Sequence, residues 1–240
     1  FSIVREDTLS HPAFVDGSRL RKFDIVLANP PYSIKQWNRD AFAHDYWGRN
    51  MFGTPPQGRA DYAFIQHIIA SMDENTGRCA ILLPHGILGR LEEQAIRECL
   101  LETDLVDCVI GIGKNLFYNS PMEACIVICR SKKPTASKDN ILFINAKHLV
   151  TRKNAESYLE PEHIAEIAAC YHERKEIPGF SRIATRDEVK VNKCYLSIGL
   201  YVERQGDDSG ASIDNLVQDW DETAITAANE LSILTNLIQQ

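Results

Sequence analysis

The sequence predicts an α/β fold built around a mostly parallel β-sheet, and two observations support this prediction. Short, nearly continuous apolar runs, such as residues 23–28 and 79–83, alternate along the chain with segments whose apolar residues recur every three or four positions. The apolar runs are typical of strands covered on both faces, and the periodic segments are typical of the helices that cover them. Because ligands bind such sheets at the carboxyl ends of the strands, the residues that follow each apolar run are the first candidates for a site.

Strands and helices alternate from the first residues to about residue 170. From their apolar and β-branched residues, strands are predicted at 1–4, 23–28, 79–83, 105–112, 124–129 and 141–144. From the spacing of their apolar residues, helices are predicted at 61–73, 90–101 and 161–173. The first strand is expected to end in a turn at 6–9. The last two strands are expected to form a terminal antiparallel hairpin or an adjacent pair.

The predicted sheet occupies residues 1–150, and the character of the chain changes beyond them. Residues 151–205 predict a mainly helical or irregular extension. The Gly-, Asp- and Ser-rich segment 206–212 predicts a flexible linker. In the last segment, 213–240, apolar residues advance by alternating steps of four and three, which predicts an amphipathic helix. The apolar face of this helix must pack against its own domain or against a helix of a partner. We favour a partner, because the linker separates the helix from the rest of the chain.

The composition predicts a globular protein of one domain with an appendage, or of two small domains. The formal net charge is −7, which argues against a protein that coats nucleic acid by bulk charge attraction. Any contact with DNA therefore requires a local basic patch or a partner subunit.

The cysteines and histidines exclude two further classes. The seven cysteines form no CxxC pair and lie mostly in apolar runs, which indicates reduced thiols in a cytoplasmic protein rather than disulfides. The seven histidines show no metal-ligand spacing, so no metal site is expected. No apolar run reaches the length of a membrane span. The chain begins with Phe1 rather than Met, which predicts that it is a fragment.

The most informative motif follows the apolar run at 23–28 and consists of Asn29, Pro30, Pro31 and Tyr32. The side-chain oxygen of Asn29 can accept one N–H of an exocyclic amine, and a main-chain carbonyl of the turn can accept the other. Pro30 turns the chain sharply, while Tyr32 offers a flat face on which a base can stack, worth about 1–3 kcal/mol per base. These four residues are the candidate catalytic residues. The alternative is a turn that only ends the strand, because Asn-Pro and Pro-Pro are common in turns.

A long loop rich in Gly, Pro and aromatic residues follows this motif. Between residues 19 and 59 the chain carries seven Lys and Arg but only three acidic residues, in contrast to the acidic chain as a whole. Long loops without periodic apolar residues are usually functional. Basic residues interleaved with aromatic ones suit a phosphate backbone and an unstacked base. Lys35 and Arg39 are therefore predicted to contact DNA, with a solvated loop of the same composition as the alternative.

The chain resembles the modification (methyltransferase) subunit of type I restriction-modification systems, a family of DNA adenine-N6 methyltransferases. The matching segments, in order, are residues 7–9, 23–32, 60–67, 77–88 and 115–119. Their order and spacing extend over most of the chain and are more specific than the Asn-Pro-Pro-Tyr motif alone. The resemblance implies the carboxyl-terminal part of a Rossmann-like class I methyltransferase sheet, with S-adenosyl-L-methionine as the cofactor. It also implies DNA as the substrate, flipping of the target base, and a complex with separate specificity and restriction subunits.

By this resemblance, Asn29, Pro30 and Tyr32 hold the target adenine, and Phe117 or Tyr118 supplies the opposite stacking wall. The family usually has Phe at the fourth motif position, and Tyr is a tolerable substitute. The Asn-Pro-Pro-Tyr motif also occurs in methyltransferases that act on a protein glutamine or on RNA, so these activities are an alternative. A third alternative is a noncatalytic scaffold that binds DNA or a specificity subunit.

The cofactor site implied by the resemblance uses Asp7, Thr8 and Leu9, together with Asn29. Asp7 is expected to approach the adenosyl end of S-adenosyl-L-methionine. The glycine-rich loop that grips the methionyl part of the cofactor in this family has no counterpart here, because it would precede Phe1. We therefore expect a fragment that binds the cofactor poorly or not at all, and that is inactive in isolation.

Overall fold

The computed structural model describes residues 1–117, 122–153 and 156–202. The chain divides into two units, Phe1–Glu203 and Arg204–Gln240, and all described residues belong to the first. The expected linker and the terminal amphipathic helix belong to the second unit and lie outside the described residues, so both stay predictions.

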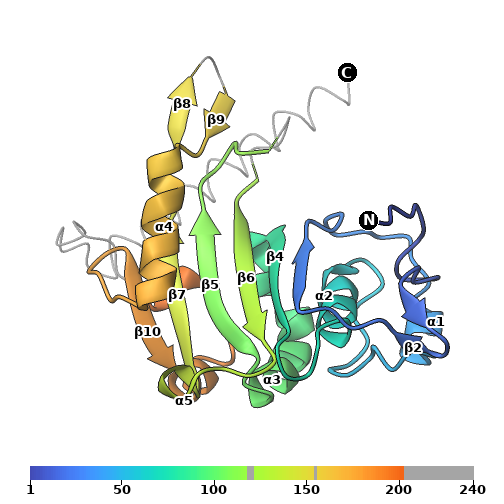
Figure 1. The fold of residues 1–240 in the computed structure, drawn as a ribbon. Coiled ribbons are helices and arrows are strands. Elements are labelled where there is room, and N and C mark those ends of the chain that lie inside the picture. Colours follow the sequence, from blue (N-terminus) through green and yellow to red (C-terminus); the bar gives the residue numbers. More distant parts are fainter. Residues whose placement is uncertain (118–121, 154–155, 203–240) are drawn as a thin grey trace, which may run out of the picture. The chain divides into compact units, whose positions relative to one another are not determined.

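A six-stranded sheet forms the centre of the first unit, with the strand order β10-β7-β5-β6-β4-β3 (Figure 1). Its strands are β3 (Ile25–Ala28), β4 (Arg78–Pro84), β5 (Val106–Ile112), β6 (Ala124–Arg130), β7 (Asn140–Ala146) and β10 (Ser181–Thr185). β3 is parallel to β4 and β5 is parallel to β7, whereas β6 is antiparallel to β4 and β5, and β10 is antiparallel to β7. Four strands therefore share one direction, which confirms the mostly parallel sheet.

The expected pairing of the strands at 124–129 and 141–144 is wrong. β6 pairs with β4 and β5, and β7 lies on the other side of β5. All seven residues of β5 are buried, so this strand needs a neighbour at each edge, and it takes β6 at one edge and β7 at the other. The antiparallel hairpin is formed by β5 and β6.

The helices agree more closely with the predicted ranges. The structure contains α1 (Arg39–Ala43), α2 (Asp61–Ala70), α3 (Gln94–Glu102), α4 (Pro161–Glu173) and α5 (Arg186–Val191). Short 3₁₀ turns are η1 (His85–Leu88), η2 (Leu91–Glu93), η3 (Thr135–Ser137) and η4 (Ile198–Leu200). The predicted helix at 161–173 is confirmed residue for residue, because Glu160 caps it, Pro161 begins it and Arg174 ends it in the left-handed conformation.

Helix α2 ends at Ala70, before the predicted end at residue 73, because the backbone leaves the helix to join the sheet. The N–H of Phe23 donates a 2.9 Å hydrogen bond to the carbonyl oxygen of Ser71, and the N–H of Asp73 donates one of 2.9 Å to the carbonyl oxygen of Phe23. These bonds set the distance between α2 and the edge strand β3.

The predicted strand at 1–4 is wrong, because residues 1–7 have no regular secondary structure. The side chains of Phe1 and Ile3 are exposed, and no described strand pairs with this segment. A strand is stable only when its backbone groups are paired. Asp7 therefore lies in a turn that follows an irregular segment.

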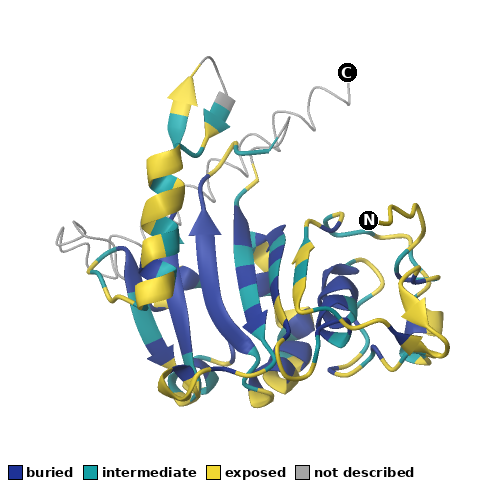
Figure 2. Cartoon of the chain, viewed as in Figure 1, coloured by how far each residue is buried: buried dark blue, intermediate teal, exposed yellow. Residues whose placement is uncertain are grey.

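Helices cover the two faces of the sheet unequally. On one face, α2 packs against β4 within the main apolar core, and on the other face α4 packs against β7 (Figure 1). The second face is open near β3, where Ile25 and Leu27 are 52% and 76% exposed, and Figure 2 shows this contrast with the buried centre of the sheet.

The remaining strands lie outside this pattern. The expected extension at 151–205 contributes β10 to the central sheet, and it also holds the small ribbon of β8 (Thr151–Lys153) and β9 (Glu156–Tyr158). A second small ribbon consists of β1 (Val15–Asp16) and β2 (Arg19–Leu20). No helix among the described residues is long and apolar enough to cross a membrane.

Candidate active site

The Asn-Pro-Pro-Tyr motif lies at the carboxyl end of β3, as the sequence predicts. β3 ends at Ala28, and Asn29 follows it with an exposed side chain that makes no hydrogen bond to any described residue. Pro30 is buried, and Ser33 turns the chain back with a positive φ of 49°. The carboxamide of Asn29 is therefore free to bind a ligand at the edge of the sheet where ligands bind in such folds.

The aromatic ring of this motif is in contact with Phe117. The ring centroids of Tyr32 and Phe117 are 6.2 Å apart, and the ring planes are inclined by 82°. The Tyr32 hydroxyl is buried and has no hydrogen-bond partner in the described structure. Burial of this hydroxyl, with smaller contributions from Cys125 and Asp61, raises the pKa of Tyr32 to about 12. Tyr32 is therefore neutral at physiological pH, and its ring presents an uncharged surface. Tyr118 lies outside the described residues.

The candidate cofactor residues form a compact turn. The Asp7 carboxylate accepts hydrogen bonds from the N–H of Leu9 (3.0 Å) and from the N–H (3.3 Å) and hydroxyl (2.9 Å) of Ser10. Partial burial raises the pKa of Asp7, but these hydrogen bonds outweigh it, so the net effect is a lowered pKa. Asp7 therefore carries a negative charge in an exposed turn.

Arg49, which the sequence reasoning did not select, holds this turn in place. Its guanidinium donates a 2.8 Å hydrogen bond to the carbonyl oxygen of Thr8 and one of 2.7 Å to that of Leu9. It also forms an ion pair of 2.6 Å with Asp45. Arg49 is only 1% exposed and lies 5.2 Å from the ring of Trp47, so it is a fixed structural contact rather than a mobile surface charge.

A small apolar cluster places the two candidate turns next to one another. Leu9 packs in this cluster with Phe42 and Phe64, and Ile34, two residues after Tyr32, packs against it. The loop that follows Tyr32 therefore contacts the Asp7 turn through apolar side chains and through Arg49. The structure thus joins the predicted cofactor residues to the loop that follows the predicted catalytic motif.

The predicted DNA contacts have different environments. Lys35 is exposed, whereas Arg39 donates a 2.8 Å hydrogen bond through Nε to the carbonyl oxygen of Pro55. Three members of the basic segment 19–59 lie apart from the motif, because Arg19, Arg21 and Lys22 line an open pocket of about 960 Å³ near the amino end of β4. The basic residues of this segment do not form a single surface.

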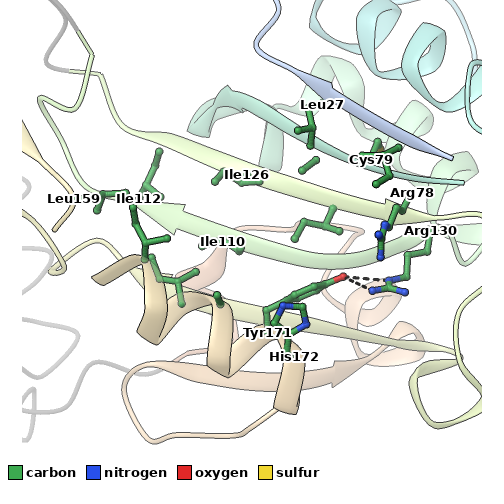
Figure 3. Close-up of a pocket in the computed structure, with 16 residues that line it drawn as sticks. Leu27, Arg78, Cys79, Ile110, Ile112, Ile126, Arg130, Leu159, Tyr171 and His172 are labelled. Atoms are coloured by element: carbon green, nitrogen blue, oxygen red, sulfur yellow. Dashed lines mark hydrogen bonds between the residues drawn. The ribbon is translucent and has the colours of Figure 1, made fainter. Parts of the chain in front are cut away.

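A second, apolar cavity of about 540 Å³ lies between the sheet and α4 (Figure 3). Its lining contains Leu27 of β3 but none of the predicted site residues. At one end the hydroxyl of Tyr171 accepts two 3.1 Å hydrogen bonds from Arg130, and both side chains contact the buried carboxylate of Asp107. These bonds join α4 to the sheet, and the cavity is distinct from the candidate active site.

The fold and the position of the motif define the class of this protein. A mostly parallel sheet with an antiparallel strand between β4 and β5, and an Asn-Pro-Pro-Tyr turn at the carboxyl end of a parallel strand, are features of a class I methyltransferase. The chain belongs to the N-6 DNA methylase family, whose sequence model matches residues 1–209.

Three relatives illustrate this membership. The chain is 32% identical to the type I restriction enzyme HindI methylase subunit of Haemophilus influenzae, over 84% of this chain and 46% of that protein. It is 30% identical to the type I restriction enzyme MpnII methylase subunit of Mycoplasma pneumoniae, over 92% of this chain and 42% of that protein. A solved structure, the type I restriction-modification system methyltransferase subunit of Streptococcus thermophilus, is 32% identical, with a TM-score of 0.75 over 82% of this chain and 41% of that chain. The chain thus spans less than half the length of these relatives.

Proposed function

We propose that this chain carries the target-base half of a DNA adenine-N6 methyltransferase, the modification subunit of a type I restriction-modification complex. The observation that carries the proposal is the free carboxamide of Asn29 at the carboxyl end of β3, three residues before Tyr32, whose half-buried ring packs edge to face with Phe117. The names of the relatives support the same function, because they are methylase subunits of type I restriction enzymes.

The chemistry of adenine explains why Asn29 is suited to this role. The lone pair of the N6 amine is delocalised into the ring, so the amine is a poor nucleophile. The Asn29 side-chain oxygen accepts one N6–H, and a main-chain carbonyl of the turn accepts the other. These two acceptors favour a pyramidal nitrogen with a localised lone pair, so the rate gain comes from position and electrostatics, without a general base.

The target base has to leave the duplex before it reaches Asn29, because its N6 amine is otherwise paired. Flipping costs a few kcal/mol. The ring of Tyr32, with Phe117 next to it, offsets part of this cost by stacking, which is worth about 1–3 kcal/mol per base. Because its pKa is raised to about 12, Tyr32 stays neutral at physiological pH, and a neutral ring suits stacking on a base.

The residues present fit one part of an S-adenosyl-L-methionine site. The exposed carboxylate of Asp7 can accept hydrogen bonds from an adenosyl group, and the backbone of Thr8 and Leu9 is fixed by the buried Arg49. Ile34, five residues after Asn29, packs against the apolar cluster that contains Leu9, which brings the loop after Asn29 to this turn. When bound, the cofactor supplies an electrophilic methyl group. The glycine-rich loop that holds the methionyl part of the cofactor in this family is expected to come from residues outside this chain segment.

The proposed partners are supported by the charge of the chain and by its relationship to methylase subunits of type I restriction enzymes. The formal net charge of −7 gives no bulk attraction to DNA, so most of the DNA contact is expected from a separate specificity subunit, which also chooses the target sequence. A restriction subunit completes the complex, and the compartment is the cytoplasm. These are the partners of a type I system.

The substrate is tested with the full-length methylase that contains this chain, purified with its specificity subunit and incubated with isotope-labelled S-adenosyl-L-methionine. DNA from a methylation-deficient host, total RNA and cell protein are offered separately, and the products are hydrolysed and identified by mass spectrometry. The proposal predicts labelled N6-methyladenine from DNA alone. Labelled methylglutamine or a methylated RNA base contradicts it, and the absence of any label together with the absence of saturable cofactor binding indicates a scaffold.

A further inference from the structure

We infer that Asp61 is a positioning residue for methyl transfer, because its carboxylate fixes the backbone immediately after Tyr32. This inference rests on the proposed function. The N–H of Ser33 donates a 2.7 Å hydrogen bond to Oδ1 of Asp61, and the Ser33 hydroxyl donates one of 3.2 Å to Oδ2. Both oxygens of one carboxylate thus hold the residue that ends the catalytic turn.

The conformation of Ser33 explains why this contact is needed. Its φ of 49° lies in the left-handed region, which is unfavourable for a residue with a Cβ atom. Hydrogen bonds to an ionised carboxylate are short and strong. Asp61 therefore stabilises a backbone conformation that Ser33 would not keep by itself, and this conformation sets the direction in which Tyr32 and Asn29 project.

Arg90 in turn holds the carboxylate of Asp61. Its Nη1 lies 2.7 Å from Oδ2 of Asp61, and its Nη2 donates a 3.4 Å hydrogen bond to the Ser33 hydroxyl. Asp61 is 1% exposed, and a buried carboxylate is costly without a paired charge, which Arg90 supplies here. A Cβ atom at Gly86 would come within 3.0 Å of Nε of Arg90, which shows how closely the backbone confines the guanidinium.

Asp61 also belongs to a rigid element. It is the first residue of α2, where the helix dipole favours a negative charge, and α2 packs against β4 in the main core. The next residue, Tyr62, donates a 3.1 Å hydrogen bond to the carbonyl oxygen of Ile87. The catalytic turn is therefore tied to the core of the sheet at a second point, besides its connection to β3.

The test is the substitution Asp61→Asn in the full-length methylase with its specificity subunit. Asn keeps an acceptor for the Ser33 N–H but loses the charge that pairs with Arg90. A misplaced reacting group costs about 10- to 100-fold in rate, so we expect a loss of that size in single-turnover methylation of DNA. The KM for S-adenosyl-L-methionine and the KM for DNA are expected to stay nearly unchanged.

The conservative rescue is Ser33→Gly, because glycine adopts the left-handed conformation without help. In the Asp61→Asn background it should restore part of the methylation rate, which a merely stabilising ion pair would not do. The matched control is Asp104→Asn, which removes an ion pair of 2.7 Å with Lys133 at the amino end of β5. This control should lower the melting temperature without lowering the rate.

The inference is overturned if Asp61→Asn and Asp104→Asn lose the same amount of stability and the same amount of methylation rate. A normal rate for Asp61→Asn while Asn29→Ala, measured in parallel, is inactive also overturns it. An active Asn29→Ala variant contradicts the proposed function instead. If Asp61→Asn does not fold, Arg90→Lys tests the same contact, because a lysine keeps the charge but loses the planar fork. The rate should then fall several-fold, and an unchanged rate overturns the inference.

Discussion

Nη2 of Arg49 donates a 2.7 Å hydrogen bond to the carbonyl oxygen of Leu9, which joins two segments that are 40 residues apart in the sequence. Arg49 lies in the loop after the candidate catalytic motif, and Leu9 lies in the candidate cofactor turn. A single buried guanidinium thus connects the part of the site that is expected to face DNA with the part that is expected to face the cofactor.

Arg49→Lys is expected to weaken cofactor binding. A lysine cannot bind Asp45 and the two carbonyl oxygens of Thr8 and Leu9 at the same time, because it lacks the fork of the guanidinium. Loss of a hydrogen bond to a charged group costs about 1.5–3 kcal/mol, which corresponds to roughly a 10- to 100-fold weaker affinity if the turn is displaced. Isothermal titration of S-adenosyl-L-methionine into the full-length protein measures this effect. Arg39→Lys, at the first residue of α1, should keep the affinity of the parent protein.

Tyr32→Phe and Tyr32→Ala are expected to differ sharply. The buried Tyr32 hydroxyl has no partner in the described structure, so its removal should not lower stability and should keep most of the activity. Alanine removes the ring and with it about 1–3 kcal/mol of stacking on the flipped base. Fluorescence of 2-aminopurine at the target position reports flipping, and only the alanine variant should reduce that signal. A strong loss of activity in Tyr32→Phe would show that the hydroxyl itself takes part.

Glu93 is expected to make stability depend on pH. Burial raises the pKa of Glu93 from its ordinary 4.5 to about 7, although Arg90 opposes the shift. Between these two values the unfolded chain releases a proton that the folded chain retains. Stability therefore falls as pH rises from 4.5 to 7, by at most about 3 kcal/mol.

Glu93→Gln removes this ionisation. The variant is expected to unfold at a higher temperature than the parent at pH 8 and at a similar temperature at pH 4.5, as measured by thermal denaturation. Glu92→Gln is the matched control, because Glu92 is adjacent and exposed, and it should change neither value. The contradicting result is a difference in stability between the parent protein and Glu93→Gln that stays constant from pH 4.5 to 7. It would show that Glu93 is already ionised at the lower pH.

Local features of this fold could be predicted from the sequence. The helix at 161–173 follows from Pro161 and the spacing of apolar residues, and the location of Asn29 follows from the apolar run before it. Both depend on neighbours in the sequence, for which hydrophobic periodicity and the turn propensity of proline are sufficient signals.

Features that depend on distant partners could not be predicted. The position of β6 between β4 and β5 depends on which strand edges remain to be paired, and periodicity carries no such information. Residues 1–4 have the composition of a strand but no described partner strand. In the sequence alone, Arg49 is one of several basic residues in a polar loop, and Asp61 is an acidic residue in the first turn of a predicted helix, where acids are common. Only the folded chain shows that these two side chains hold the two candidate turns.

The most direct test of the central claim compares Asn29→Ala with Asn75→Ala, a change of an exposed asparagine beyond the amino end of β4, in the full-length methylase with its specificity subunit. Single-turnover methylation of DNA and the affinity for S-adenosyl-L-methionine are measured for both variants. Loss of one preorganised polar contact in the transition state costs about 100- to 1,000-fold. We therefore predict a loss of that size for Asn29→Ala with nearly unchanged cofactor affinity, and no loss for Asn75→Ala. A normal methylation rate in Asn29→Ala, or an equal loss of rate and of cofactor affinity, would contradict the role assigned to Asn29.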